Sequence, residues 1–207
     1  MSRGKFITLE GGEGAGKSTL LRGLGEALTA RGREVVLTRE PGGTPAANAV
    51  RDLVVRGDGE RWSVLSETLL FAAARNDHLE RLIRPALTGG KWVLCDRYMD
   101  STAAYQVDGR GLPQSAFDTL HGLIGAEKPD LTLILSVDPQ AGVARSRGIA
   151  IGESRFEQMD VAFHERVRAS FLALAAREPE RCVVIDSTQE KSAVLAQALA
   201  AIDARLT

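Results

Sequence analysis

The feature that most constrains this chain is the segment Gly11-Gly-Glu-Gly-Ala-Gly-Lys-Ser18, a complete G-x-x-x-x-G-K-[ST] pattern. It lies between the apolar run Phe6-Ile-Thr-Leu9 and a helical pattern that begins at Thr19. Glycines let backbone N–H groups point inward at phosphate oxygens, and the helix N-terminus adds its positive end. The alternative, a Gly-rich turn that only joins a strand to a helix, fits this context less well. The predicted phosphate-binding residues are Gly11, Gly12, Glu13, Gly14, Ala15, Gly16, Lys17, Ser18 and Thr19.

Three polar residues in and near this loop have chemistry suited to a nucleoside triphosphate. Lys17 is expected to reach the β- and γ-phosphates as a mobile point charge. The Ser18 hydroxyl is placed to ligate a magnesium ion that bridges them, and Asp96, at the end of a later strand, can hold the same ion through water. The sequence therefore predicts Mg²⁺ as the cofactor.

Length and charge limit the other possibilities. The 207 residues suffice for one α/β domain spanning 1–207, and Lys plus Arg (26) nearly balance Asp plus Glu (27). This balance does not suggest a surface for nucleic acid or membrane. No stretch approaches the ~18 apolar residues of a membrane helix, so we expect a cytoplasmic protein with small-molecule partners.

The cysteines and histidines do not form a reactive or metal-binding pattern. Cys95 and Cys182 lie inside apolar runs, which favours small buried side chains over a disulfide or a redox pair. His78, His121 and His164 are scattered without ligand spacing, and we expect surface or packing roles for them.

Short apolar runs alternate with longer helical patterns along the whole chain. This rhythm is typical of βαβ units around a buried parallel sheet. Gly32, Gly89-Gly90 and Pro179 mark helix ends. The expected strands are 5–9, 35–38, 92–95, 131–137 and 182–186, and the expected helices are 17–31, 45–56, 62–88, 114–126, 139–147, 157–177 and 189–205.

Two further segments follow expected strands, at the sheet edge where open α/β folds bind ligands. Thr38-Arg-Glu-Pro-Gly-Gly43 follows the second strand, and Asp96-Arg-Tyr98 follows the third. An Arg beside an Asp can bridge the donor and acceptor phosphates during transfer. An ordinary surface ion pair is the alternative, but the phosphate-binding loop favours the ligand site.

The order of motifs resembles that of bacterial thymidylate kinases. Besides the segments above, the motifs that carry the resemblance are Leu69-Leu-Phe-Ala-Ala-Ala-Arg75, Asp96-Arg-Tyr-Met-Asp-Ser-Thr-Ala-Ala-Tyr-Gln106, Gly109-Arg-Gly-Leu112 and Pro129-Asp-Leu-Thr132. The resemblance covers essentially the whole chain. It implies a P-loop NTPase fold with strand order 2-3-1-4-5, transfer of the ATP γ-phosphoryl group to dTMP, and a homodimer.

The resemblance also implies residues that bind the acceptor nucleoside. Phe71 would lie under the thymine ring, and Arg75 would donate to one of its carbonyl oxygens. Thr102 and Gln106 would complete the hydrogen bonds of the base, and Tyr105 would lie where a ribose 2′-hydroxyl would protrude. From spacing alone, Phe71 could be a core residue, Arg75 a solvated one, and the other three ordinary helix residues.

The acceptor phosphate needs cationic donors once it loses water. Arg97 is the first candidate, and Arg39 and Arg51 are the others, although Arg51 could equally lie on an exposed helix face. Pro41 would line the same site. Glu13 would repel phosphate, and the resemblance implies that it holds the sugar 3′-hydroxyl or a magnesium-bound water.

The phosphate-binding loop contains no arginine, so we expect the remaining catalytic cation to come from elsewhere. Segment 145–155 carries three arginines and two glycines between two helices, and it is either a solvated loop or a lid that closes over phosphates. The resemblance favours a short arginine-rich lid at about 145–156. Arg155 is the first catalytic candidate, Arg147 the second, and Arg145 a supporting cation toward ATP.

Other assignments are less specific. Thr188 and Gln189 resemble the segment that lines adenine. The apolar faces of helices 45–56 and 62–88 are the expected dimer surface.

Two rival functions remain open. One is a kinase for another monophosphate, such as dUMP or a deoxyguanylate. The other is a nucleotide-dependent switch, which the missing Asn-Lys-x-Asp run and the additional phosphate-directed arginines disfavour.

Overall fold

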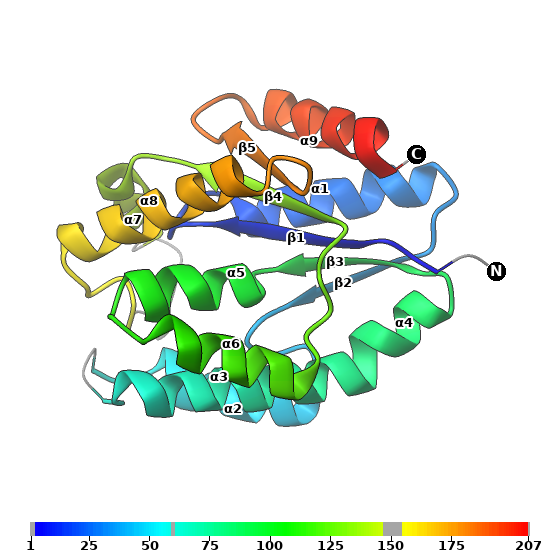
Figure 1. Cartoon of the computed structure of the whole chain (residues 1–207). Helices are drawn as coiled ribbons and strands as arrows, with labels where there is room; N and C mark the ends of the chain where they lie inside the picture. The colour runs from blue at the N-terminus through cyan, green and yellow to red at the C-terminus, as the bar shows by residue number, and fades with distance from the viewer. Residues whose placement is uncertain (1–2, 59–60, 147–154, 207) are drawn as a thin grey trace.

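The computed structural model describes residues 3–58, 61–146 and 155–206. Its centre is a five-stranded parallel sheet with the order β2-β3-β1-β4-β5, which confirms the expected order (Figure 1). The strands are β1 (Phe6–Gly11), β2 (Val35–Arg39), β3 (Trp92–Asp96), β4 (Leu131–Ser136) and β5 (Cys182–Asp186). In the register, Arg39 lies beside Asp96, and Asp96 lies beside Leu9. The carboxyl ends of β1, β2 and β3 therefore meet at one edge.

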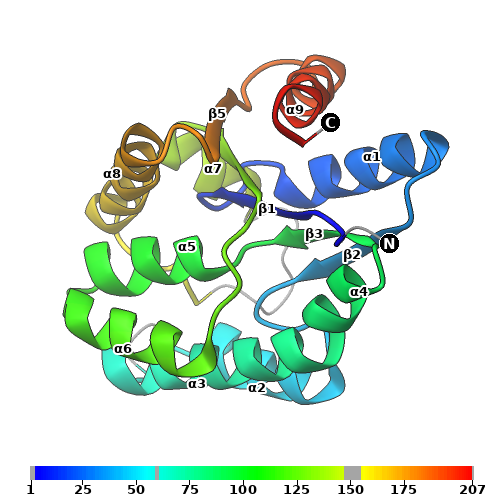
Figure 2. The same ribbon diagram turned by 45° about the vertical axis from the view of Figure 1, so that its right-hand side comes forward.

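Helices cover both faces of the sheet, as Figure 2 shows. One face packs against α1 (Lys17–Ala30) and α9 (Lys191–Leu206). The helical elements on the other side are α2 (Pro45–Val55), α3 (Val64–His78), η1 (Leu79–Ile83), α4 (Arg84–Thr88), α5 (Met99–Thr102), η2 (Ala103–Asp108), α6 (Gln114–Ile124) and α8 (Val161–Arg177). The short helix α7 (Pro139–Ser146) follows β4 and packs against α8.

The alternation of side chains along the strands divides the core in two. Ile7 and Leu9 point to the face covered by α1 and α9, whereas Phe6 packs on the other face with Val93 and Tyr98. All six residues of β1 are buried. Because both faces of a parallel sheet are covered, its central strands are mostly apolar, and polar residues within them such as Thr8 and Thr132 are buried and hydrogen-bonded to each other (2.8 Å).

The expected helix 62–88 is wrong in its details. It begins at Val64, because the Ser63 side chain caps it by accepting from the N–H of Ser66. The chain then passes through a π-helical turn at Leu79–Ile83 before α4 continues to Thr88. Pro85 has no N–H to donate to a preceding carbonyl, and the irregular turn lies directly before it.

The helix ranges expected from the sequence also omit one helical element. Residues Met99–Asp108 form α5 and the π-helical η2. No side chain of its own segment caps α5. Instead, the Glu10 carboxylate of β1 accepts from the Tyr98 N–H (2.8 Å) and the Ser101 hydroxyl (2.5 Å). A helix whose N-terminus is satisfied by a distant strand carries no local start signal.

Two other expectations are settled by the described residues. The expected start of helix 157–177 is wrong, because α8 begins at Val161, where Asp160 accepts from the N–H of Phe163 (2.7 Å). Both cysteines are buried and free, as expected. Among the described residues, no helix is long and apolar enough to cross a membrane.

Candidate active site

The phosphate-binding loop connects β1 to α1 at the shared edge of the sheet. Gly16 precedes α1 with a φ of 90°, a conformation that glycine adopts without steric cost. Gly14 has a φ of 63°, and a Cβ added there would lie 1.9 Å from the carbonyl oxygen of Gly142 in α7. Only glycine fits this close approach, so the loop is seated against α7.

Lys17 is buried, and its ammonium group faces back into the loop. Nζ donates to the carbonyl oxygens of Gly12 (2.7 Å) and Gly11 (3.1 Å). Burial and the neighbouring Arg97 charge lower the pKa of Lys17 to about 8, although nearby carboxylates oppose the change. Phosphate oxygens would offer this ammonium group stronger acceptors than carbonyls do.

Ser18 and Asp96 lie together, as expected for a magnesium site. The Ser18 hydroxyl donates to Asp96 Oδ2 at 2.7 Å. Within the described residues, no group of three or more His, Cys, Asp or Glu side chains could hold a metal. One hydroxyl and one carboxylate fit Mg²⁺, which prefers oxygen ligands and takes its remaining ligands from phosphates and water.

Arg97 connects the phosphate-binding loop to Tyr105. Its backbone is left-handed (φ 69°), and its guanidinium donates to Glu13 Oε1 (2.8 Å), the Gly11 carbonyl (3.0 Å) and the Ser101 hydroxyl (3.2 Å). The Tyr105 hydroxyl donates to the same Glu13 oxygen at 2.9 Å. Burial would raise the pKa of Glu13, but Arg97, Lys17 and Tyr105 together lower it to about 2.

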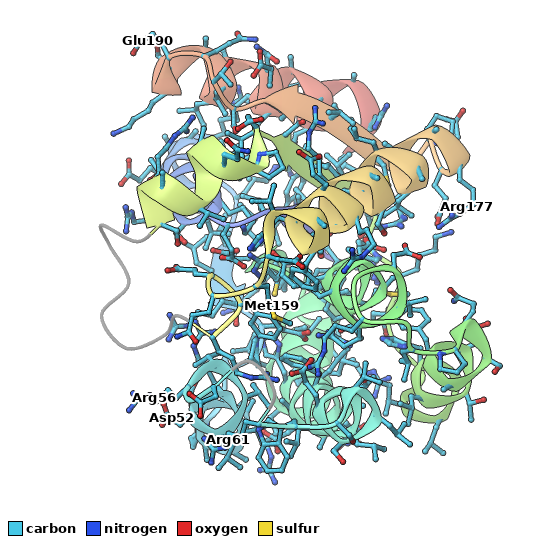
Figure 3. The ribbon with its side chains drawn as sticks, turned by 90° about the vertical axis from the view of Figure 1, so that its left-hand side faces the viewer. Asp52, Arg56, Arg61, Met159, Arg177 and Glu190 are labelled. Carbon is cyan, nitrogen blue, oxygen red and sulfur yellow. The ribbon has the colours of Figure 1, made fainter. Side chains whose placement is uncertain are left out.

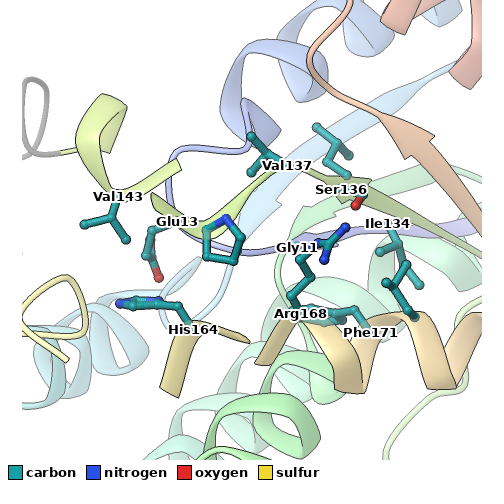
Figure 4. Close-up of a pocket in the computed structure, with 13 residues that line it drawn as sticks. Gly11, Glu13, Ile134, Ser136, Val137, Val143, His164, Arg168 and Phe171 are labelled. Atoms are coloured by element: carbon teal, nitrogen blue, oxygen red, sulfur yellow. The ribbon is translucent and has the colours of Figure 1, made fainter. Parts of the chain in front are cut away.

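Behind the loop lies a small pocket whose walls come from β4, α7 and α8 (Figure 4). There the His164 ring of α8 lies near the Glu13 side chain, and its charge would favour the ionised carboxylate. Spacing along the sequence did not single out His164 as a neighbour of the loop, since the tertiary fold alone brings α8 there.

Arg75 lies in a separate, fully buried network. Its guanidinium donates to Glu40 Oε2 (2.7 Å) and the Thr102 hydroxyl (3.0 Å), and it lies over the Tyr98 ring at 5.1 Å. A third bond joins Nη1 to the His121 ring (3.0 Å). The expected proximity of Arg75 and Thr102 is present, whereas Glu40 and His121 were not predicted as partners.

The expected base-stacking residue belongs to an aromatic cluster. Phe71 is half-buried, and its ring centroid lies 6.4 Å from that of Phe156. Phe156 also packs edge-on against Tyr105 at 5.6 Å. The sequence indicated Phe71 and Tyr105 separately. Phe156, which follows the arginine-rich segment, was not predicted to join them.

Arg155 was expected in a lid that closes over the phosphates. In the structure it is buried against α2 and α3. Its guanidinium pairs with Glu67 and donates to the carbonyls of Asp58 (2.9 Å) and Val54 (3.1 Å). Glu67 also accepts from Gln106 and Arg110, each at 2.8 Å. Thus Gln106, expected at the base, is bound to a carboxylate that the motifs did not indicate.

The structure separates the remaining phosphate candidates. Arg39 is exposed at the end of β2. Arg51 donates to the carbonyl of Pro41 (3.0 Å), while its neighbours Asp52 and Arg56 form an exposed ion pair on the outer side of α2 (Figure 3). Arg51 therefore reaches the Arg-Glu-Pro-Gly-Gly segment instead of the solvated helix face.

The residues expected to line adenine and to support the ATP phosphates from α7 are exposed. Thr188 lies in a turn and donates twice to Asp186, and Gln189 accepts from Gln197 (2.8 Å). Arg145 is exposed near the end of α7. Arg147, like the rest of 147–154, lies outside the described residues.

Comparisons with known proteins agree in their result. The family model of thymidylate kinase matches residues 9–198. A thymidylate kinase from Caulobacter vibrioides is 51% identical over 197 residues, which is 95% of this chain and 94% of that protein. One from Rhizorhabdus wittichii is 50% identical over 202 residues, which is 95% of this chain and 97% of that protein.

A solved structure extends the similarity to the fold. The crystal structure of thymidylate kinase from Ehrlichia chaffeensis superposes with a TM-score of 0.80 and 35% identity, covering 97% of this chain and 99% of that one. The sequence motifs, the strand order and the loop geometry agree with these matches. The chain belongs to the thymidylate kinase family.

Proposed function

We propose that this chain transfers the γ-phosphoryl group of ATP to dTMP, giving ADP and dTDP. The observation that carries the residue assignment is the cluster of charges at the shared edge of β1, β2 and β3. There Glu13 accepts from Arg97 and from Tyr105, and the Lys17 ammonium acts electrostatically on the same carboxylate. This cluster joins the proposed triphosphate-binding loop to the side chains that we assign to a second nucleotide.

On the donor side, backbone N–H groups of the loop would bind the phosphates and Lys17 would neutralise the β- and γ-oxygens. Ser18 and Asp96 would hold Mg²⁺, which when bound draws charge from the phosphate oxygens. We assign adenine to the exposed segment at Thr188 and Gln189. The protein contributes position and charge, without a covalent intermediate.

On the acceptor side, we assign the monophosphate to Arg97, with Arg39 and Arg51 around Pro41 as further donors. Phe71 would stack on the thymine, and Arg75 with Thr102 would bind its carbonyl edge. Glu13 would accept from the sugar 3′-hydroxyl. Tyr105, held by Glu13, would fill the space beside the 2′ carbon and so disfavour a ribonucleotide.

The additional catalytic cation remains assigned to the arginines of 145–155. Arg155 would have to leave its buried pair with Glu67 to reach a phosphate. Breaking such a pair is costly because Glu67 is buried and would keep only Arg110 as a cationic partner. We therefore propose that Arg155 anchors the end of this segment in the conformation described. Arg147, with Arg145 in support, is then the better source of charge at the transferring phosphate.

A homodimer is the proposed assembly. Among the described residues, four of the seven exposed large hydrophobic side chains lie on α2, α3 and α6, which pack together: Leu53, Leu65, Leu69 and Leu123. Such a grouping favours an interface with a second copy. Leu69→Glu should shift sedimentation toward a monomer, whereas Val184→Glu, at an exposed position of β5 on the opposite edge of the sheet from β2, should not. The expected cytoplasmic location stays a prediction.

The reaction is tested by coupled turnover assays with ATP and a panel of monophosphates: dTMP, dUMP, dCMP, dGMP and the ribonucleotide of thymine. We expect dTMP to give the highest kcat/KM. Preference for a purine monophosphate would contradict the acceptor assignment, and slow ATP hydrolysis without transfer would favour a nucleotide switch.

A further inference from the structure

His121 is a buried residue of α6 with a defined proton position. Its side chain packs on the ring of Phe117, with centroids 3.9 Å apart. Nδ1 lies 2.9 Å from the Phe117 carbonyl oxygen, which can only accept a hydrogen bond. Nδ1 therefore carries the proton, and the neutral ring keeps a lone pair on Nε2.

That lone pair faces Arg75. Nε2 lies 3.0 Å from Nη1 of the guanidinium, which can only donate. Burial and the Arg75 charge lower the pKa of His121 to about 4. The ring thus stays neutral near pH 7 and acts as an acceptor for a buried cation, which is more than the packing role expected from the sequence.

The contacts of Arg75 constrain its guanidinium from several elements. Glu40 accepts from Nε, Thr102 accepts from Nη2, and His121 accepts from Nη1. A guanidinium has five N–H groups, two on each terminal nitrogen. Each terminal nitrogen therefore has a second N–H that can donate to a ligand, and its direction follows from the partners that fix the group.

We propose that His121 is a positioning residue, which holds the guanidinium of Arg75 and thereby contributes to selectivity for a base with a carbonyl oxygen at position 4. The inference rests on the proposed role of Arg75. Thymine and uracil present an acceptor at that position, whereas cytosine presents an amino donor that would face N–H groups. A loosely held Arg75 would distinguish them less well.

The test compares two replacements of similar size. In His121→Gln the side-chain oxygen can take the place of Nε2, whereas His121→Met fills the site with at most a weak acceptor. Phe117→Leu is the matched packing control, because it disturbs the ring contact and keeps the backbone carbonyl. For each variant, kcat and KM are measured with dTMP, dUMP and dCMP, together with KM for ATP and the thermal midpoint.

We expect His121→Met to lower kcat/KM for both dTMP and dUMP by about tenfold, which is the size expected for the loss of one hydrogen bond to a charged group. The ratio of kcat/KM for dTMP to kcat/KM for dCMP should fall by a similar factor. KM for ATP should not change. His121→Gln should restore the ratio to within roughly twofold of the unaltered protein. Phe117→Leu should lower the thermal midpoint and leave the ratio intact.

Two results would overturn the inference. The first is a dTMP-to-dCMP ratio that stays unchanged in His121→Met while Arg75→Ala loses its selectivity. This result would show that His121 is only a packing residue. The second comes from the unaltered protein, so it does not depend on any variant folding: nitrogen NMR that finds the His121 proton on Nε2. If Arg75→Ala itself keeps full selectivity, the proposed role of Arg75 fails, and the two failures are thereby distinguished.

Discussion

The phosphate end and the base end of the proposed site are held by different kinds of contact. At the phosphate end, Lys17 donates to the carbonyls of its own loop and Ser18 donates to Asp96. At the base end, Arg75 donates to a carboxylate, a hydroxyl and a neutral imidazole, all from buried side chains. The first set of partners can be exchanged for phosphate oxygens and a metal ion, whereas the second leaves two N–H groups of Arg75, one on each terminal nitrogen, for a ligand.

This difference has a physical reason. Phosphates and Mg²⁺ bring large charges that outcompete backbone carbonyls, so the loop need only point its donors inward. A neutral base brings weak hydrogen bonds that discriminate only if the donors are already fixed. Selectivity in this chain is therefore expected from the preformed base end, and rate from the phosphate end.

The largest effect should follow from Lys17→Ala. The change removes charge from the transition state, so turnover should fall by about 10³-fold or more while the fold is kept. Turnover in a coupled assay and circular dichroism measure the two. Lys91→Ala, at the opposite end of β3, is the matched control and should keep normal turnover. Retained turnover in the Lys17 variant would contradict the assignment of the loop.

The next largest effect concerns Arg155. Because Arg155→Ala removes one of the two cationic partners of the buried Glu67 and leaves the carbonyls of Asp58 and Val54 without this donor, it should lower the free energy of unfolding by about 3 kcal/mol. Urea denaturation measures this. The exposed Arg145→Ala should change stability by less than about 0.5 kcal/mol. Normal stability with a severe loss of turnover in Arg155→Ala would show instead that Arg155 acts at the phosphate.

Phe71→Ala should weaken dTMP binding by about 1–3 kcal/mol, the range for loss of base stacking, and leave ATP binding nearly unchanged. Titration calorimetry with each nucleotide separates the two effects. Phe71→Leu serves as the control, since it keeps an apolar side chain and loses the ring. If both nucleotides bind more weakly by equal amounts, Phe71 is a core residue only.

The smallest effect should appear as a change of stability with pH. The pKa of His121, about 4, lies below its ordinary value of 6.5. The unfolded state therefore binds the proton more tightly, and stability falls as pH drops from 6.5 toward 4, with no loss above 6.5. Between pH 7 and 5 this amounts to about 2 kcal/mol. His121→Gln should lose correspondingly less in urea denaturation over the same interval, and an equal loss would contradict the neutral buried ring.

Local patterns predicted much of the fold and part of the site. The strand-to-helix loop and the five strands were predicted correctly, because glycine spacing and apolar runs depend on neighbouring residues. The strand order, also correct, was implied by the family resemblance and not by these local patterns. The predicted pairing of Ser18 with Asp96 follows from the rule that parallel strands end at one edge. The expected helix ranges omitted Met99–Asp108 because its cap comes from Glu10, although Thr102, Tyr105 and Gln106 were expected to be helical.

The sequence by itself determined the glycine-rich loop between β1 and α1 that we propose binds phosphate, and its motifs indicated the family. Only the tertiary structure decided which side chains face one another across distant segments. It set Arg155 against Glu67, and it placed His121 of α6 against Arg75 of α3. Hydrogen bonds between side chains 46 or 88 positions apart leave no periodic trace in a sequence, because they depend on how whole helices pack.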